Sequence, residues 1–439
     1  MEVCIMSEIT IGILGLGVLL VVFMTGIELG YAMFIIGFIG FCVIKTVAAG
    51  LNLLAKDVFD VFASYSFTVV PVFLFMGQAA FNAGIASKMY DTSHKFIGHV
   101  PGGLAMATVA GATLFKAICG SSTATAATFA SVAVPEMDRF GYKKELSTGI
   151  VATVGTLGCI LPPSSVLIIF GIITQQSIGR LFLAGVVPGI LIAFLFLVVI
   201  YGWCKISPSI GPRGPKYSWS DRWKSLPEVI WPVVIFIIII GGMLKGFFTP
   251  TEAGSVGTTA VLLLCFAKRS LGFKAFARSV SESLRSACMV MMLIAGSAVL
   301  GHFLAVTKIP MITAAWLIAL PLHPYLIMVM ITLIYLLGGS FIDDMAFMVL
   351  ATPIFYPAVE KLGFDPLWFG IIIGITVMIG VVVPPMAINV FVVKNITRTP
   401  FNVIYRGVYP FLLALVGAAI LLFIFPQLVT FVPNILMPG

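Results

Sequence analysis

The sequence has 439 residues, of which 60% are hydrophobic and only 10% are charged. About a quarter of the residues of a soluble globular protein are charged, so this composition excludes that class and predicts an all-α polytopic membrane protein surrounded by lipid. The formal charge of +8 comes mainly from basic residues in short segments between apolar runs, where they set membrane topology, so no nucleic-acid partner is expected. The seven cysteines show no CxxC or Cys/His spacing, so no transition metal is expected.

The first half of the chain, residues 1–204, begins with three apolar runs that predict membrane spans. These runs cover Ile9 to Met24, Ile27 to Ile44 and Phe59 to Ala83. The first run is not expected to be a signal peptide, because no basic segment precedes it and no small-x-small cleavage pattern follows it.

Each half then contains a longer apolar stretch, a span broken in its middle and a closing span. We expect the longer stretch to form a re-entrant helical hairpin, which enters and leaves the membrane on one side. A cytoplasmic connector, residues 205–228, leads to the second half, residues 229–439. The predicted hairpins and broken spans cover about 104–138 and 145–177 in the first half, and about 326–360 and 366–397 in the second.

A shift of 222 residues aligns the middle of the chain with its end without a gap. Over Ser121 to Pro188 nine positions hold the same residue, and seven of these are glycine or proline, which set backbone geometry. We therefore expect a duplication. With a re-entrant hairpin each half crosses the membrane five times. Because this number is odd, the second repeat starts on the opposite side of the membrane from the first, so the two repeats are inverted. In the first half, the nine residues that are identical to their partners 222 positions later are Pro135, Gly141, Ile150, Gly158, Pro162, Pro163, Gly185, Val186 and Pro188.

The placement of basic residues supports re-entrant hairpins. With the N-terminus outside, the predicted cytoplasmic segments are roughly 85–103, 139–144, 205–228, 268–285 and 394–406. They hold 18 of the 25 lysine and arginine residues, and the opposite side holds six. The remaining one, Lys116, lies inside the first hairpin. If the hairpins were ordinary spanning helices, everything after them would change sides and this segregation would largely disappear.

Inverted repeats with broken helices predict a transporter whose site lies near the bilayer midplane. The middle of the first hairpin, Cys119 to Thr125, is rich in glycine and hydroxyl residues. Irregular backbone at that depth is tolerated only where it is buried or lines a wet cavity, and its freed carbonyls suit an alkali cation while its freed amides suit an anion. The alternative is a helix-packing face of small residues.

The two broken spans each contain successive prolines, Pro162-Pro163 and Pro384-Pro385. Two prolines remove two amide donors and disfavour helical geometry in the residue before them, so the preceding carbonyls lose their partners and can ligate sodium. A simple kink without a ligand is the alternative for one such motif. Its recurrence at the same offset favours a binding site.

The second hairpin carries Asp343-Asp344, which the 222-residue shift places on Ser121-Ser122. Ionisable residues within the membrane are costly and usually functional. Either the tip opens into an aqueous cavity and one carboxylate helps to hold the cation, or the hairpin is shallower and the pair is merely solvated. Asn389 is a weaker candidate, and Lys394 is assigned to the cytoplasmic loop.

These patterns predict two sets of site residues and no catalytic residue. The expected sodium ligands are Ser121, Ser122, Gly155, Gly158, Leu161, Pro163, Gly339, Asp343, Gly380, Val383 and Pro385. The expected substrate contacts are Ser122, Thr123, Thr125, Ser164, Asp344 and Asn389.

Several motifs resemble the large membrane subunit (DctM-like) of tripartite ATP-independent periplasmic (TRAP) transporters, along nearly the whole chain. They include the segments Gly120 to Ala126, Thr249 to Gly254 and Gly363 to Gly370, together with both proline pairs. The resemblance implies a sodium-driven secondary transporter of the bacterial inner membrane, with an elevator mechanism, that takes up an organic anion such as a carboxylate or sulfonate. It also implies a small four-helix membrane subunit (DctQ-like) and a periplasmic substrate-binding protein (DctP-like) as partners, and no cofactor besides the sodium ion.

Other functions are less consistent with the sequence. A channel needs a continuous polar pore, which no set of spans provides, and an enzyme needs a constellation of a base, nucleophile or metal ligands, which is also absent. No GxxxxGK[ST] loop indicates nucleotide-driven transport. The closest alternative is a stand-alone sodium/anion symporter that needs no binding protein.

Overall fold

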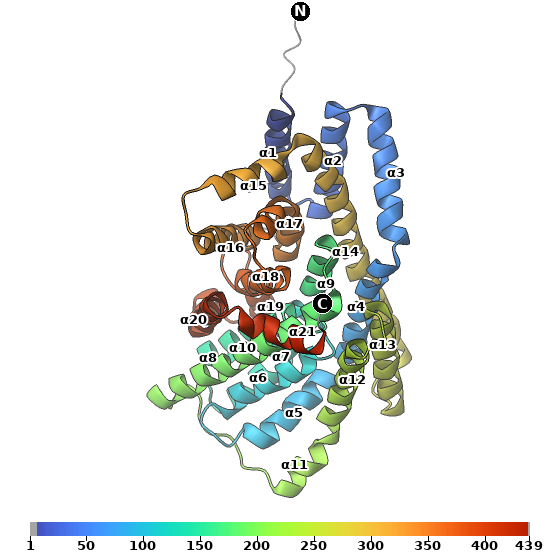
Figure 1. The fold of residues 1–439 in the computed structure, drawn as a ribbon. Coiled ribbons are helices and arrows are strands. Elements are labelled where there is room, and N and C mark those ends of the chain that lie inside the picture. The colour runs from blue at the N-terminus through green and yellow to red at the C-terminus, as the bar shows by residue number, and fades with distance from the viewer. Residues whose placement is uncertain (1–6, 342, 438–439) are drawn as a thin grey trace, which may run out of the picture.

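The structure is a computed structural model and describes residues 7–341 and 343–437. Every regular element within these residues is a helix, which confirms the all-α prediction (Figure 1). The α-helices are α1 (Glu8–Met24), α2 (Leu29–Ile44), α3 (Val47–Ala63), α4 (Val69–Asn82), α5 (Ile85–Ile97), α6 (Gly103–Lys116), α7 (Ser122–Arg139), α8 (Lys144–Val154), α9 (Ser165–Ile173), α10 (Ile178–Ile206), α11 (Trp219–Ser225), α12 (Pro227–Leu244), α13 (Pro250–Ala267), α14 (Phe273–Thr307), α15 (Ile309–Ala319), α16 (Pro324–Phe341), α17 (Asp344–Lys361), α18 (Pro366–Gly380), α19 (Ile388–Thr397), α20 (Phe401–Ile424) and α21 (Gln427–Leu436). Two 3-10 helices, η1 (Tyr65–Thr68) and η2 (Gly155–Cys159), complete the set.

Six of the described helices are long and apolar enough to cross a membrane, and a seventh span is formed if the bent pair of α3 and α4 counts as one. Helices α1 and α2 are also apolar, but with 17 and 16 residues they are slightly shorter than the six spanning helices. The chain is therefore a polytopic membrane protein. The count of five crossings per half stays a prediction, because length and composition alone do not settle it.

The third predicted span of the first half differs from the expected one. The sequence predicted a single run from Phe59 to Ala83, whereas two helices join at an angle of 52°. Helix α3 begins earlier, because the Thr46 hydroxyl accepts a hydrogen bond from the Ala49 amide and so caps its first turn. Helix α3 ends before Ser64, which has an extended backbone, and η1 leads into α4.

Both predicted hairpins consist of two helices with a short break between them. Helices α6 and α7 form the first hairpin, and α16 and α17 form the second. The two second helices begin in the same way: Ser121 caps α7 by accepting from the Ala124 amide, and Asp343 caps α17 by accepting from the Ala346 amide. These two capping residues lie 222 positions apart, as do the first residues of α8 and α18.

Both predicted broken spans are interrupted as well. Helix α8 continues into η2 and stops before the first proline pair, after which α9 starts at Ser165. Helix α18 ends at Gly380, and α19 starts at Ile388 beyond the second proline pair. The peptide bonds Pro162-Pro163 and Pro384-Pro385 are both cis. We call the segments 155–164 and 381–387 the first break and the second break.

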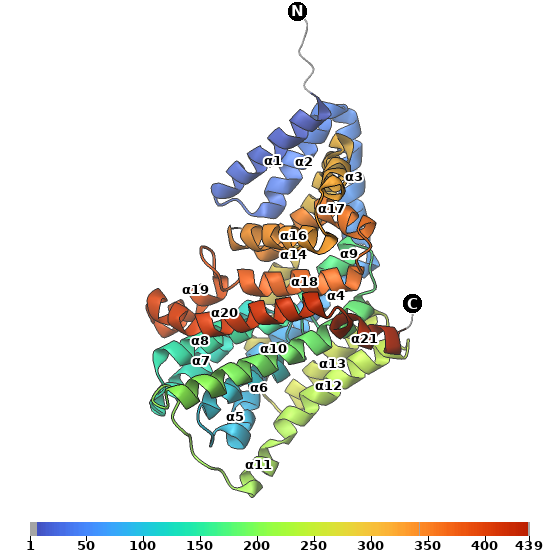
Figure 2. The ribbon, with the colours of Figure 1, turned by 60° about the vertical axis from the view of Figure 1, so that its left-hand side comes forward.

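The helices form two groups that we name by their content. The outer group contains α2, α4, α13 and α14, in which α2 packs along α14 and α4 packs against α13 and α14. The hairpin group contains α6 to α10 and α16 to α20, and Figure 2 shows α10, α18 and α20 side by side within it. Figure 1 shows α12 and α13 at one side of the molecule and α16 and α20 at the other.

A very close helix crossing in the hairpin group joins α8 to α20. Gly149 of α8 faces Gly407 of α20, and a side chain on either would overlap the backbone of the other helix. Only two glycines allow this approach, because any Cβ atom at the crossing would occupy the space of backbone atoms. Through this contact a helix of the second half packs directly on the first broken span.

Candidate functional site

The tip of the first hairpin lies directly against the first break. The Ser122 hydroxyl is 3.2 Å from the Cys159 sulfur. A Cβ atom on Gly120 would lie 2.6 Å from the Pro163 carbonyl oxygen, and one on Gly155 would lie 2.9 Å from the Ser122 carbonyl oxygen. The structure therefore brings together the hairpin tip and the break that the sequence assigned to one site.

The Ser121 carbonyl oxygen is the acceptor for several groups at this tip. It accepts a hydrogen bond from the Thr125 hydroxyl at 2.9 Å and one from the Lys116 ammonium at 2.6 Å. Lys116 is fully buried. No role was predicted for this lysine from the sequence, although a lone ionisable residue in an apolar hairpin is the kind of signal that could have identified it.

Two predicted substrate contacts, Ser164 and Thr125, donate their hydroxyl protons to backbone carbonyl oxygens of the protein. The buried Ser164 hydroxyl donates to the Cys159 carbonyl oxygen at 2.7 Å, and the buried Thr125 hydroxyl donates to Ser121 as described above. A hydroxyl that already donates its proton presents only lone pairs, which suit a cation better than an anion. Thr123, in contrast, is exposed at the tip.

The tip of the second hairpin is joined to the second break through the backbone. The Met386 amide donates to the Ser340 carbonyl oxygen at 3.1 Å. Gly339 and Gly380 are buried, Val383 and Asp343 are half-buried, and Pro385 is exposed. Asp344 begins α17, but its side chain lies outside the described residues.

Asn389 connects the two broken spans. It lies in α19, beyond the second break, yet its side-chain amide donates to the Ala152 carbonyl oxygen of α8 at 3.2 Å. The same nitrogen would lie 3.1 Å from a Cβ atom on Gly155 in the first break. The Asn389 side-chain oxygen is buried and has no hydrogen-bond partner among the described residues. A buried acceptor left without a donor is costly, so this oxygen is available to a bound ligand.

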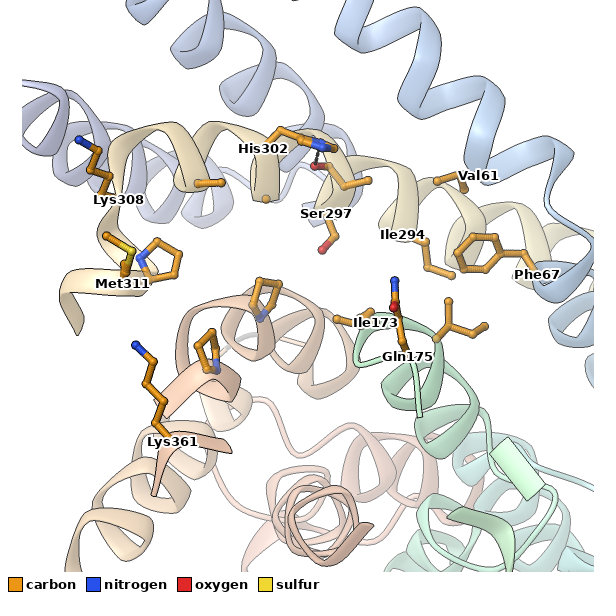
Figure 3. A pocket seen from close by; sticks show the side chains of 17 residues that line it. Val61, Phe67, Ile173, Gln175, Ile294, Ser297, His302, Lys308, Met311 and Lys361 are labelled. Atoms are coloured by element: carbon orange, nitrogen blue, oxygen red, sulfur yellow. Dashed lines mark hydrogen bonds between the residues drawn. The ribbon is translucent and has the colours of Figure 1, made fainter. Parts of the chain in front are cut away.

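A cavity of about 720 Å³ is lined by residues of α14 on one side and of α9 and α17 on the other (Figure 3). Lys308 at the end of α14 and Lys361 at the end of α17 lie at one end of it, and Gln175 lies farther along. His302 also lines the cavity, and its Nδ1 is 2.9 Å from a carboxylate oxygen of Asp57 in α3. The cavity does not include the hairpin tips, and the sequence analysis did not predict it, because its walls come from segments far apart in the chain.

Helix hairpins packed against interrupted helices are the architecture of membrane transporters with a central binding site. Residues 16–428 match the family described as "Tripartite ATP-independent periplasmic transporter, DctM component", and the chain belongs to this family. It is therefore a transporter subunit of the bacterial inner membrane and not an enzyme. The resemblance found in the sequence is confirmed.

Several relatives are similar over most of their length. The chain is 33% identical to the C4-dicarboxylate TRAP transporter large permease protein DctM of Pseudomonas aeruginosa, over 87% of this chain and 89% of that protein. It is 30% identical to the sialic acid TRAP transporter large permease protein SiaM of Vibrio cholerae, over 90% and 92%. It is 32% identical to the ectoine TRAP transporter large permease protein TeaC of Halomonas elongata, over 84% and 86%.

Two solved structures share the fold. The Alcanivorax borkumensis YdaH transporter superposes with a TM-score of 0.64 at 12% identity, over 87% of this chain and 89% of that one. Neisseria gonorrhoeae MtrF superposes with a TM-score of 0.59 at 15% identity, over 85% and 84%. At these identities the likeness concerns the fold alone.

Proposed function

We propose that this chain is the large permease subunit of a sodium-coupled importer for a small organic anion. The observation that carries the proposal is the contact between each hairpin tip and its break, in a chain of the DctM family. The relatives are named for C4-dicarboxylates, sialic acid and ectoine. Each of these compounds carries at least one carboxylate, and a further relative is named for isethionate, which is a sulfonate, so a carboxylate or sulfonate anion is the substrate class.

The repeated helix starts support two inverted repeats, residues 1–204 and 229–439. The capping residues of α7 and α17 and the first residues of α8 and α18 keep the 222-residue offset. In this proposal each repeat crosses the membrane five times, and the hairpin group moves as an elevator against the outer group. The cavity between α14 and α17 lies between these groups, and its basic residues Lys308 and Lys361 suit an anion on its way to the hairpin tips.

The second break is the proposed sodium site. Carbonyl oxygens of Gly339, Gly380 and Val383, next to Pro385, and the carboxylate of Asp343 are hard oxygen ligands of the kind that alkali cations prefer. The corresponding set at the first break is Ser121, Ser122, Gly155, Gly158, Leu161 and Pro163. Ser122 and Thr123 at the first tip, with Asn389 and Asp344, are the proposed substrate contacts.

Uptake by the reconstituted complex tests the proposal. Labelled carboxylates and sulfonates are offered to proteoliposomes that contain this chain, the small membrane subunit and the genomically adjacent binding protein, under an inward sodium gradient. Each component is omitted in turn. We expect uptake to require all of them. Uptake without the binding protein would instead establish the stand-alone symporter, and uptake that ignores sodium would refute the coupling.

The substitution Asp343→Asn tests the second break. Asparagine still caps α17 by accepting from the Ala346 amide, so the helix start is kept while the negative charge is lost. We expect the half-saturating sodium concentration for uptake to rise about tenfold, as for the loss of one charge-assisted ligand. The matched control is Asp365→Asn, because Asp365 caps α18 through the Leu367 amide outside the predicted site. Equal sodium dependence in both variants would remove Asp343 from the ion site.

A further inference from the structure

Lys116 places a positive charge inside the first hairpin. It is the last residue of α6 and is fully buried. The carbonyl end of a helix favours a cation, so the end of α6 contributes to the stability of the charged form. No ion pair among the described residues joins Lys116 to a carboxylate. A buried charge without an opposite charge beside it is expensive, and within a membrane it usually marks a functional site.

The ammonium lies between the hairpin tip and the first break. On the hairpin side it donates to the Ser121 carbonyl oxygen at 2.6 Å. On the other side it packs against Gly158, where a Cβ atom would overlap the ammonium nitrogen and lie 2.9 Å from Cε. Ser121 and Gly158 are both residues that the sequence predicted as ligands of a sodium ion. The Lys116 ammonium therefore lies between Ser121 and Gly158, where a sodium ion was predicted.

The second half of the chain has no equivalent of this lysine. The 222-residue offset places Gly338 opposite Lys116, and Asp343-Asp344 opposite Ser121-Ser122. The first tip thus gains a positive charge, whereas the second tip has acidic residues and no lysine at the matching position. Acidic oxygens attract a free cation, and a tethered ammonium repels one from its own site.

We infer that the Lys116 ammonium takes the place of a sodium ion at the first break. The inference rests on the proposed function, because it assumes that the two breaks are the cation positions of a sodium-coupled importer. Sodium then binds at the second break, and Lys116 supplies the fixed positive charge beside the anionic substrate at the first. The transporter needs one sodium ion fewer per cycle than a chain with a neutral residue at position 116.

Equilibrium binding of ²²Na⁺ alone to the purified chain with its small subunit tests this inference without a known substrate. Lys116→Ala removes the ammonium and opens the space between Ser121 and Gly158. We expect it to bind one more sodium ion per chain than the unsubstituted protein. The control is Lys205→Ala, an exposed lysine at the end of α10, which should leave the number of bound ions unchanged.

The outcomes separate the inference from the proposed function. If the unsubstituted protein binds sodium and the folded Lys116→Ala variant binds the same number of ions, the tethered cation is refuted while sodium coupling stands. If neither protein binds sodium, both the coupling and the inference are refuted.

A second variant keeps the test decisive if Lys116→Ala does not fold. Lys116→Met retains the length and apolar character of the side chain but fills the position with a neutral group. We expect the complete reconstituted complex with this variant to take up the labelled acids at no more than about one tenth of the unsubstituted rate. The reduction should hold at every sodium concentration, because a charge in a low-dielectric site is lost. Uptake equal to that of the unsubstituted complex would overturn the inference.

Discussion

Gly407→Ala should strongly destabilise the fold, because α8 and α20 cross with their backbones in contact at this residue. A single added Cβ atom would overlap the Glu145 carbonyl oxygen of α8 and lie 3.0 Å from the Gly149 Cα atom. Backbone atoms cannot rotate away as a flexible side chain can, so the helices must separate. Overpacking costs about 1–3 kcal/mol and occasionally more, and we expect a value at or above the upper end here. The measurement is the fraction of detergent-solubilised protein that remains monodisperse after stepwise heating.

The matched control for this substitution lies in the same helix. Gly417 of α20 faces open space, and a Cβ atom added there would meet no neighbouring atom within 4 Å. Alanine also has the better helix propensity, so Gly417→Ala should leave the thermal midpoint unchanged or raise it slightly. If Gly407→Ala were as stable as Gly417→Ala, the backbone contact between α8 and α20 at Gly407 would be contradicted.

Asn389→Ala should reduce substrate uptake about tenfold while the protein still inserts, since the hydrogen bond that joins the two broken spans is lost and such a bond contributes about 0.5–1.5 kcal/mol. The side chain links α19 to the Ala152 carbonyl oxygen of α8 and keeps a buried oxygen free beside the first break. Alanine removes both functions. Initial uptake rates in proteoliposomes, normalised to the amount of reconstituted protein, measure the effect.

A second asparagine of α19 provides the comparison. Asn395 lies on the same helix but is exposed. Asn395→Ala should therefore transport at the unsubstituted rate. Normal uptake by Asn389→Ala would show that the contact between the two broken spans does not contribute to transport.

The starts of the hairpin helices could be predicted because their causes are local. A serine or aspartate that caps the next helix, and a proline pair that ends the previous one, act within a few residues, so Ser121, Asp343 and both proline pairs are readable from the sequence. The bend between α3 and α4 was missed. Helix α3 carries Lys56, Asp57 and Asp60 among its apolar residues, so its apolar run is interrupted and its first part was not included in the predicted span.

The contacts that define the site could not be predicted, because they join distant segments. The Asn389 amide reaches Ala152 across 237 positions of the chain, and no local pattern encodes that distance. Lys116 is only five residues from Ser121, but its position against Gly158 depends on how the first hairpin packs on the first break. Likewise, the cavity between α14 and α17 exists only after both groups of helices have assembled.

The unbroken helix α14 gives one side of the outer group a stiffness that the other side lacks. Its 35 residues form a rod of about 52 Å, longer than the roughly 30 Å of hydrocarbon in a bilayer. The 222-residue shift places the first-half pair α3 and α4 on α14, and this pair has a similar length but is divided by η1 and bent by 52°. A continuous helix resists bending, whereas a junction at which a short 3-10 turn interrupts the α-helical hydrogen bonds can act as a hinge. During the proposed elevator cycle the elastic strain should therefore concentrate at residues 64–68, and α14 should remain straight.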